Sequence, residues 1–352
     1  MKSNLNPMLK LMEKEKGIPR ADLIELLESA MTSAFSKHAR GTTYTAKIGS
    51  ESGEMQVFVR KEVVSKVSDE TNQISKTDAL KIDPAAEIGQ TVDVEVAAEK
   101  FGRIAAQTAK QIIVQKIKEN ERENLYDKYK DRVGQILTVK LYRFVRDSAI
   151  VEIGDTEAIL PDREQIPGER LSRGSSFKVY IVEVTRGSKG PRILVSRTHP
   201  GLVEGLFRME VPEVEEGVVK VLKIVRDPGV RCKAAVDSTN SRVDPIGACV
   251  GINGVRVQAV ISELGGERID LIKHSDNIEQ YLVNSLSPAD VSEVIITDRK
   301  KKEARLVVND DMLSLAIGKN WQNVRLADRL TQWHLDIQSE TQLQEIKQKK
   351  FT

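Results

Sequence analysis

The first part of the chain combines one long amphipathic stretch with several shorter alternations of apolar and polar residues. Residues 18–40 carry apolar side chains at helical spacing, with Pro19 near the start and Gly41 just past the end, which predicts a helix. Segments 43–48, 55–67 and 91–96 alternate as β-strands do. Basic and acidic residues balance over residues 1–125. We therefore predict an α+β domain that contacts protein rather than RNA.

A second helical pattern covers residues 101–132, which contain no proline and only one glycine, Gly102. The apolar positions of its first half recur at helical spacing, and the stretch becomes largely polar from Lys118. The segment lacks the glycine and serine content of a flexible linker, so we predict a rigid connector helix. A coiled coil is the competing interpretation, but the apolar stripe is too short for several heptads.

From Gly134 the pattern changes to short strands at regular spacing, separated by glycine and proline turns. Five such strands over about seventy residues are what a small closed β-barrel needs. The order and lengths of the strands resemble an OB-fold of the S1 type.

Basic residues interleaved with aromatic ones mark this predicted barrel. No acidic residue occurs between Arg186 and Arg197, and the same composition is found along residues 140–146. The residues concerned are Lys140, Tyr142, Arg143, Phe144, Arg146, Arg186, Lys189, Arg192 and Arg197. Proteins that bind single-stranded nucleic acid use this composition. The alternative is a solvated strand face with Tyr142 or Phe144 in the barrel core.

An internal repeat occupies the last third of the chain. Residues 248–264 align with residues 315–330 at an offset of 67 positions, which matches Gly251 to Gly318, Asn253 to Asn320 and Val257 to Val324. Each copy reads as strands, a helix, a tight loop, a second helix and a final strand. The duplication predicts two small α/β domains in tandem.

The loop of the first copy is Gly251-Ile252-Asn253-Gly254, a GXXG sequence between two helices. In the KH fold this loop holds about four nucleotides of single-stranded backbone. Glycines allow close approach to sugar and phosphate, and the N–H groups at the start of the next helix attract an anion. We predict RNA contacts for these four residues and for Arg256, whose alternative role is that of a solvated helix residue.

The second copy departs from this pattern, because its loop is Gly318-Lys319-Asn320-Trp321. A tryptophan does not take a positive φ as cheaply as a glycine, and its ring blocks close approach of a ligand. We expect weakened or altered RNA binding, with Gly318, Lys319, Asn320 and Arg325 as the contacting residues. Two alternatives remain open for Trp321, stacking on RNA and simple packing in the fold.

Composition restricts the function further. The net charge is +2, so any nucleic-acid binding must come from local patches. Cys232, Cys249 and four scattered histidines have no metal-ligand spacing, and we expect no metal ion, no cofactor and no catalytic residue. No apolar run approaches the roughly 20 residues of a membrane-spanning helix, so we expect a cytoplasmic protein without membrane contact.

Two functional hypotheses compete with plain RNA binding by a regulator. An RNA-processing enzyme would need a catalytic domain within the first 130 residues, where Glu51, Glu54, Asp69 and Glu70 lie on polar, turn-like stretches without a glycine-rich loop or a histidine partner. Solvated charges explain these residues better, so we expect no enzyme. A ribosome-associated or other translational RNA-binding protein stays open, because only the partner of the N-terminal domain separates it from a transcription factor.

Long motifs of the chain resemble the bacterial NusA family of transcription elongation and termination factors. The resemblance extends from the first helix to about Gln338, with Trp321 as its main departure. It is carried by FGRIAAQTAKQIIVQKI, RTHPGLVEGLFRMEVPEVEEGVV, RDPGVRCKAAV, RVDPIGACVGINGVRVQAVISELGGERIDLI and AIGKNWQNVRLADRLTQW.

The resemblance implies a multidomain α+β protein in four parts. Residues 1–130 form an RNA-polymerase-binding domain with its connector helix, 131–200 an S1 RNA-binding domain, 201–278 a first KH domain and 279–345 a second KH domain, both of type II. The implied activity is non-catalytic. The protein would bind core RNA polymerase near the RNA exit channel and the nascent single-stranded RNA, and modulate pausing, intrinsic termination and, with other antitermination factors, antitermination. We expect a monomer that lacks the acidic C-terminal repeats of some members.

Overall fold

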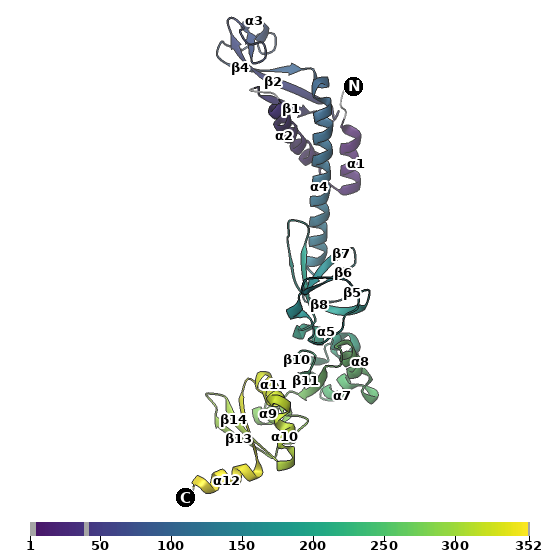
Figure 1. Cartoon of the computed structure of the whole chain (residues 1–352), viewed down its shortest axis with the longest axis vertical. Coiled ribbons are helices and arrows are strands. Elements are labelled where there is room, and N and C mark those ends of the chain that lie inside the picture. The colour runs from purple at the N-terminus through teal and green to yellow at the C-terminus, as the bar shows by residue number, and fades with distance from the viewer. Residues whose placement is uncertain (1–4, 39–41, 351–352) are drawn as a thin grey trace. The chain divides into compact units, whose positions relative to one another are not determined.

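The structure is a computed structural model that describes residues 5–38 and 42–350. Contacts within the chain divide it into two units, residues 1–125 and 126–352. Figure 1 labels the elements of both units.

The first unit is an α+β domain around a four-stranded sheet. Strand β2 (Met55–Val64) is central and pairs with β1 (Tyr44–Ile48) and β4 (Thr91–Val96) antiparallel and with β3 (Gln73–Ser75) parallel. The short helix α3 (Lys76–Ala79) follows β3. The sequence pattern predicted β1, β2 and β4 but not β3, whose three residues are too few to show an alternation.

Helices α1 (Asn6–Lys16), α2 (Arg20–His38) and the start of α4 (Gly102–Lys130) contribute the apolar core beside this sheet. Leu23, Leu27, Met31 and Phe35 of α2 are fully buried at intervals of four residues, as the pattern predicted. The predicted helix 18–40 thus begins at Arg20, and its end at residues 39–40, with Gly41, lies outside the described residues.

Helix α4 confirms the helix predicted over residues 101–132. Its apolar positions Ala105, Ala109 and Ile113 are buried in the core of the first unit. The apolar side chains of α4 therefore pack inside that domain and not against another long helix. The coiled-coil interpretation is wrong for these positions. At the other end of α4, buried Tyr129 donates a hydrogen bond to the carbonyl of Ile153, 2.8 Å away.

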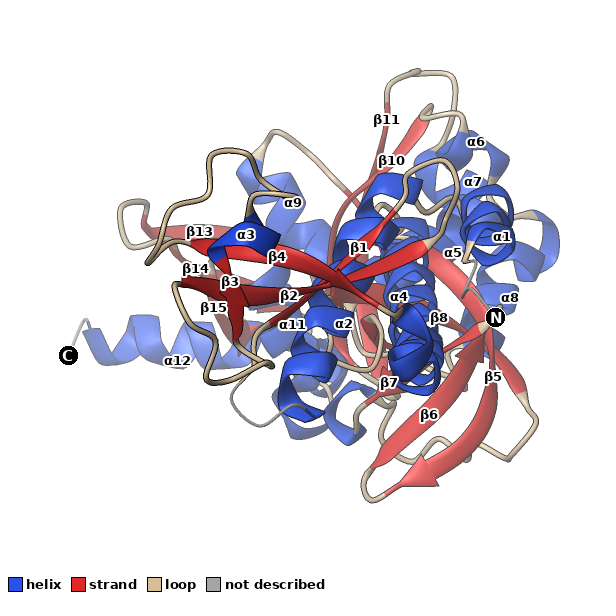
Figure 2. Cartoon of the chain, turned by 90° about the horizontal axis from the view of Figure 1, so that it is seen from above, coloured by secondary structure: helices blue, strands red, loops and turns tan. Residues whose placement is uncertain are grey.

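The second unit begins with a closed five-stranded barrel in the order β5-β6-β7-β9-β8, which confirms the predicted OB-like barrel. Its strands are β5 (Ile136–Val145), β6 (Ser148–Ile153), β7 (Thr156–Leu160), β8 (Ser176–Thr185) and β9 (Arg192–Ser196). Strands β5 and β6 run side by side as an antiparallel pair (Figure 2). Alternate residues of β5 and β8 point into the core, among them Val139, Leu141, Val179 and Ile181.

Two domains of the same topology follow and confirm the internal repeat. The first runs through α5 (Pro200–Glu210), α6 (Pro212–Glu215), β10 (Val219–Asp227), β11 (Arg231–Ser238), α7 (Pro245–Val250), α8 (Val255–Glu263) and β12 (Arg268–Lys273). The second runs through α9 (Ile278–Ser285), β13 (Glu293–Asp298), β14 (Glu303–Val308), α10 (Leu313–Ile317), α11 (Gln322–Thr331) and β15 (His334–Ser339), before the final helix α12 (Glu340–Lys350).

In each copy the first strand pairs antiparallel with the second, and the second pairs parallel with the third. The parallel pair requires the crossover that the two helices and their loop provide. This is the type II KH arrangement that the family resemblance implied. Helix α11 of the second copy packs on the sheet of the first through Leu326 and Leu330, which meet Val225 and Ala235.

Candidate nucleic-acid interface

The first GXXG loop is a tight turn in left-handed backbone between α7 and α8. Gly251 has φ/ψ of 73°/174°, Asn253 52°/24° and Gly254 77°/10°. Gly251 lies in a region open only to glycine, and Asn253 is one of the few residue types that adopt αL readily. The turn leaves Ile252 86% exposed at its tip.

The second loop has the same backbone conformation despite its different sequence. Gly318 has φ/ψ of 74°/166°, Asn320 52°/38° and Trp321 61°/19°. The tryptophan therefore takes the left-handed conformation of the glycine it replaces. Its side chain is 65% exposed, so the alternative that Trp321 packs inside the fold is wrong.

The surroundings of the glycines explain which loop position accepts a side chain. A Cβ on Gly251 would lie 2.7 Å from Cγ of Arg256, and one on Gly318 would lie 2.9 Å from Cβ of Asn323. A Cβ on Gly254 would meet nothing within 4 Å. The first glycine of each loop is thus required by packing as well as by φ, whereas the fourth position faces open space and admits a tryptophan at the cost of backbone strain alone.

Arg256, predicted as an RNA contact, lies against the first loop. Its guanidinium donates to the carbonyl of Ala248 at 2.7 Å and to Glu213 Oε2 at 2.8 Å. The Ala248 carbonyl belongs to the end of α7, so Arg256 joins the two helices that flank the loop.

Asn323 occupies the position in the second copy that Arg256 occupies in the first. Like Arg256, it joins the two helices that flank its loop. It is fully buried, and its Nδ2 donates to the carbonyls of Ala316 and Leu286, each at 3.0 Å. The prediction from sequence missed Asn323, although the 67-residue offset pairs it with Arg256.

Arg325, also predicted as an RNA contact, lies between the two KH domains. Its guanidinium and that of Arg329 both bind the carboxylate of Asp227, at the end of β10 in the first domain. Gln322 Nε2 donates to the same carboxylate at 3.2 Å. Asp227 is 19% exposed at its side chain, and Arg325 is 57% exposed. The sequence did not point to Asp227 or Arg329, because their partners are about a hundred residues away.

A cavity of about 540 Å³ lies where the first KH domain meets helix α9 of the second. Its lining comes from α7, from β12 and the residues that follow it, and from α9 of the second domain. The lining residues are Ile246, Leu271, Ile272, Lys273, His274, Ser275, Gln280, Asn284 and Ser287. Apolar walls with hydroxyl, amide and ammonium groups suit the faces and edges of nucleobases.

The aromatic residues of strand β5 are on the surface of the barrel. Tyr142 is 36% exposed and Phe144 52% exposed, so the interpretation that places them in the barrel core is wrong. Arg143 stacks over Tyr142 with its guanidinium 4.6 Å from the ring centre, and it forms a 2.8 Å ion pair with Glu157. Lys140 is exposed on the same strand.

Arg192 begins β9, which is not a neighbour of β5 in the barrel. It lines a separate cavity of about 470 Å³ with Arg163, Glu183 and Thr185. The structure therefore divides the predicted basic surface into a β5 part, with Lys140 and Arg143, and a part with Arg192, where β8 ends and β9 begins.

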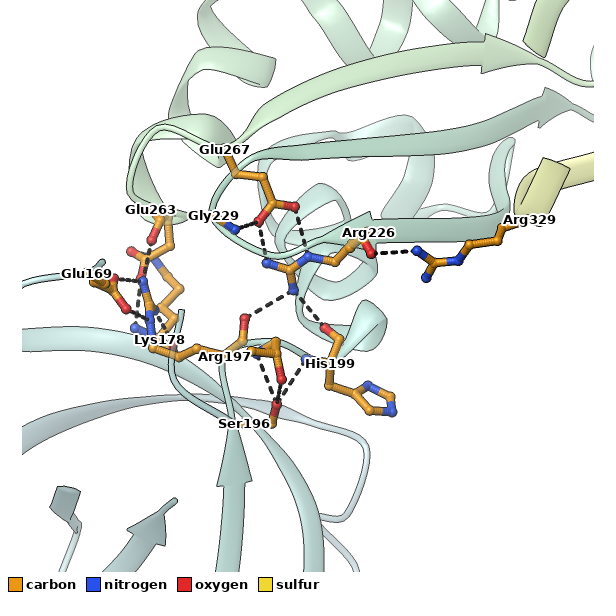
Figure 3. Close-up of polar contacts among 11 residues, drawn as sticks. Glu169, Lys178, Ser196, Arg197, His199, Arg226, Gly229, Glu263, Glu267 and Arg329 are labelled. Carbon is orange, nitrogen blue, oxygen red and sulfur yellow. Dashed lines mark hydrogen bonds and ion pairs between the residues drawn. The ribbon is translucent and has the colours of Figure 1, made fainter. Parts of the chain in front are cut away.

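Arg197 is not part of that surface, and its inclusion there is wrong. It is 1% exposed at the junction of the barrel and the first KH domain (Figure 3). Its guanidinium binds the carboxylates of Glu169 and Glu263 and donates to the carbonyl of Lys178 at 2.6 Å. A buried guanidinium whose N–H donors are all bound within the protein stabilises the fold and has no donor left for a ligand.

Arg226 completes this junction from strand β10. It forms a fully buried ion pair with Glu267 at 2.7 Å and donates to the carbonyls of Arg197 and His199 at 3.1 Å and 3.0 Å (Figure 3). Its own carbonyl accepts from Arg329 of the second KH domain at 3.1 Å. Atoms of one residue therefore bind the end of the barrel, the first KH domain and the second KH domain.

His199 caps helix α5 at the same junction. Its Nδ1 accepts a hydrogen bond from the Gly201 amide at 3.0 Å, and its ring stacks on Tyr180 with the centres 4.2 Å apart. Burial lowers the pKa of His199, and the charge of Arg226 adds to this, although Glu164 opposes it. The imidazole therefore caps the helix in its neutral form.

Cys232 on β11 and Cys249 on α7 are both buried in the core of the first KH domain. Burial raises the pKa of Cys249 to about 11, and it raises the pKa of Cys232 as well. The thiols are thus poor nucleophiles. Among the described residues no three His, Cys, Asp or Glu side chains gather as a metal site, and none of the described helices has the length and apolar character needed to span a bilayer.

Comparisons with known proteins agree with this architecture. The NusA N-terminal domain family matches residues 4–123, the NusA-like first KH domain residues 197–274 and the NusA-like second KH domain residues 278–345.

Curated relatives match almost the whole chain. The transcription termination/antitermination protein NusA of Bacillus subtilis is 42% identical over 98% of this chain and 93% of its own length. The protein of the same name from Thermus thermophilus is 39% identical over 92% of this chain and 87% of its own length. Among solved structures, the N-terminal domain of NusA from B. subtilis is 40% identical and covers 34% of this chain and 96% of its own, with a TM-score of 0.28.

Proposed function

Because the chain belongs to the NusA family of transcription termination/antitermination proteins, we propose that it binds core RNA polymerase and the nascent single-stranded RNA together. It acts as a monomer in the cytoplasm, without catalysis, a metal ion or a cofactor, and it works with other antitermination factors. The family assignment does not favour a ribosome-associated or translational role.

The observation that carries the RNA part is the pair of loops at equivalent positions with the same backbone geometry. Residues 251–254 contact the RNA backbone, which can approach closely at Gly254 because a Cβ there would meet nothing within 4 Å. Gly318, Lys319 and Asn320 form the second contact. Arg256 acts by holding the first loop, since its guanidinium is already engaged by Glu213 and Ala248.

The barrel supplies a further RNA contact through Lys140, Arg143 and Arg192. The exposed rings of Tyr142 and Phe144 support this role, since bases stack on such side chains. Arg325 contributes by fixing the two KH domains against each other, and its exposed face adds positive charge to the path of the RNA.

Each of four parts of the chain has its own binding function. Residues 1–130 bind the polymerase, residues 131–200 and 201–278 bind RNA through the barrel and the first KH domain, and residues 279–345 bind RNA through the second KH domain. The balanced charge of residues 1–125 supports a protein partner for the first part.

The RNA contact is tested on the full chain with Gly254→Asp, which places a negative charge in the first loop, and with Lys319→Glu in the second. Gly89→Asp is the matched control, since Gly89 also has a positive φ and open space around its Cβ, in the first unit. We expect both loop variants to weaken binding of a single-stranded ribosomal leader RNA about 10-fold or more, with a smaller salt dependence, and the control to bind as the wild type does. Unchanged binding by both variants would refute the loop assignment.

The polymerase contact is tested by co-precipitation of the full chain with bacterial core RNA polymerase and, in parallel, with ribosomes. Binding to the polymerase and not to ribosomes supports the proposal. The reverse result would favour the translational alternative.

A further inference from the structure

The two KH loops share their backbone but present different side chains. Where the first loop has Ile252 and Gly254, the second has Lys319 and Trp321. Lys319 is exposed and makes no ion pair with any residue in the described part of the chain. Residues 312–327 contain Lys319 and Arg325 and no acidic residue. The second loop therefore adds a free cation and a large ring at the same place.

Trp321 lowers the stability of the folded chain. Its left-handed backbone is disfavoured for any L-residue with a side chain, and 65% of its surface faces solvent. It belongs to none of the apolar core clusters of the described residues. A glycine would serve the loop better, as Gly254 does in the first copy. Strained residues without a packing role are concentrated at binding sites.

We propose that Trp321 stacks on a base of single-stranded RNA while Lys319 binds the adjoining phosphate. This rests on the proposed RNA-binding function and assigns the second loop a different kind of contact from the first. In the first loop the open position at Gly254 allows sugar and phosphate to approach the backbone. In the second the indole occupies that space, so the ligand there must offer a flat aromatic face, and the basic segment around it favours a polyanion that carries such faces.

Stacking on an exposed ring is tolerant of sequence, because every base has a π-face. The second loop would thus hold RNA without selecting its sequence. The neighbouring residue Gln322 donates a hydrogen bond to Asp227 of the first KH domain, which ties the start of α11, next to Trp321, to that domain.

The chain has only two tryptophans, Trp321 and Trp333, which makes the test direct. In a Trp333→Phe background, Trp321 is the single indole fluorophore. The probes are an oligoadenylate RNA and an abasic ribose-phosphate oligomer of the same length and charge. We expect oligoadenylate to quench the fluorescence of Trp321 and the abasic oligomer to leave it unchanged.

Affinity is measured on the otherwise wild-type chain, so the result does not depend on how Trp333→Phe folds. We expect Trp321→Ala to weaken binding of oligoadenylate by about 5-fold to 100-fold and to leave binding of the abasic oligomer unchanged. Trp321→Phe should retain most of the affinity, because it keeps a ring.

The possible failures are distinguishable. Equal losses for both oligomers in Trp321→Ala would show a structural role and overturn the proposal, as would unchanged affinity and fluorescence with oligoadenylate. If Gly254→Asp still weakens RNA binding in that case, the proposed function stands without the stacking contact. If the wild-type chain binds neither oligomer nor the leader RNA, both proposals fall.

Discussion

Trp321 and Gly254 occupy equivalent positions of two loops and share one left-handed backbone conformation, with φ of 61° and 77°. The space that surrounds Gly254 explains how the loop accepts the larger residue without rearrangement. The substitution therefore changes the surface offered to a ligand and leaves the loop itself intact.

Trp321→Gly is expected to stabilise the folded chain. Relief of the left-handed strain is worth about 1–2 kcal/mol, and the greater freedom of glycine in the unfolded chain offsets part of it, which leaves a gain of roughly 0.5–1 kcal/mol. Denaturant unfolding of the full chain measures this. Gln332→Gly is the control, since Gln332 has φ of 61° and lies outside the loop; it should stabilise to a similar extent. A destabilised Trp321→Gly protein would contradict this account of the strain.

Glu213→Gln separates two roles for Arg256. If Arg256 bound phosphate directly, removal of the carboxylate that competes for it would tighten RNA binding. If it holds the first loop between α7 and α8, loss of the 2.8 Å ion pair loosens the loop and weakens RNA binding. We expect weaker binding, by about 2-fold to 5-fold, since exposed and half-exposed ion pairs are worth at most about 1 kcal/mol. RNA titration of the two proteins at one salt concentration decides between them.

Asp227→Asn is expected to loosen the second KH domain from the first. The carboxylate accepts from Arg325, Arg329 and Gln322, and an amide cannot satisfy both guanidinium groups. Faster amide hydrogen exchange in α11 and in β10 would report the change. Asp336→Asn removes the exposed partner of Arg305 and should leave exchange in α11 and β10 unaltered. Equal exchange in Asp227→Asn and the wild type would mean that the apolar contacts alone hold the interface.

Glu267→Gln is expected to destabilise the second unit by about 3–5 kcal/mol, because it leaves the Arg226 charge buried without its partner. Glu157→Gln, which breaks the exposed ion pair with Arg143, should cost less than about 1 kcal/mol. Thermal unfolding of the full chain measures both. Similar losses for the two variants would show that the buried pair contributes no more than an exposed one.

Acidification is expected to weaken the junction through His199. Its pKa is lowered in the folded chain, so the unfolded chain binds a proton more readily. The stability that the neutral imidazole supplies is complete above the ordinary pKa of 6.5 and is lost as the pH falls through the lower, folded value. His199→Asn keeps a capping side chain without titration, so its melting temperature should fall less on acidification. Parallel curves for the two proteins would refute this.

The elements that the sequence predicted well are those whose pattern is local. The amphipathic spacing of α2, the short strands of the barrel and the 67-residue repeat are all visible along the chain, and the two loops follow from the repeat. The short elements β3 and α3 were missed because three or four residues do not establish a period.

The roles of the arginines were harder to predict. Whether a guanidinium is available to a ligand depends on which carboxylates or carbonyls it already binds in the fold. Arg256, Arg325 and Arg197 bind carboxylates that are 43, 98 and 66 residues away in sequence. Charge composition places such residues in a basic stretch, but only the fold shows which charges are already paired. Lys319, which has no such partner in the described part of the chain, is the cation of the second loop that remains available to a ligand.

Arg226 also limits how this protein can exchange parts with its relatives. Its side chain needs the carbonyls that follow β9 and the carboxylate of Glu267, and its carbonyl needs the guanidinium of Arg329. A chimaera that takes its second KH domain from another chain must keep a donor at the position of Arg329, wherever the gene is joined, because Glu267 lies in the same domain as Arg226 and any residue supplies a backbone carbonyl. Recombination at the loops between domains would preserve every helix and strand and still produce mismatched partners.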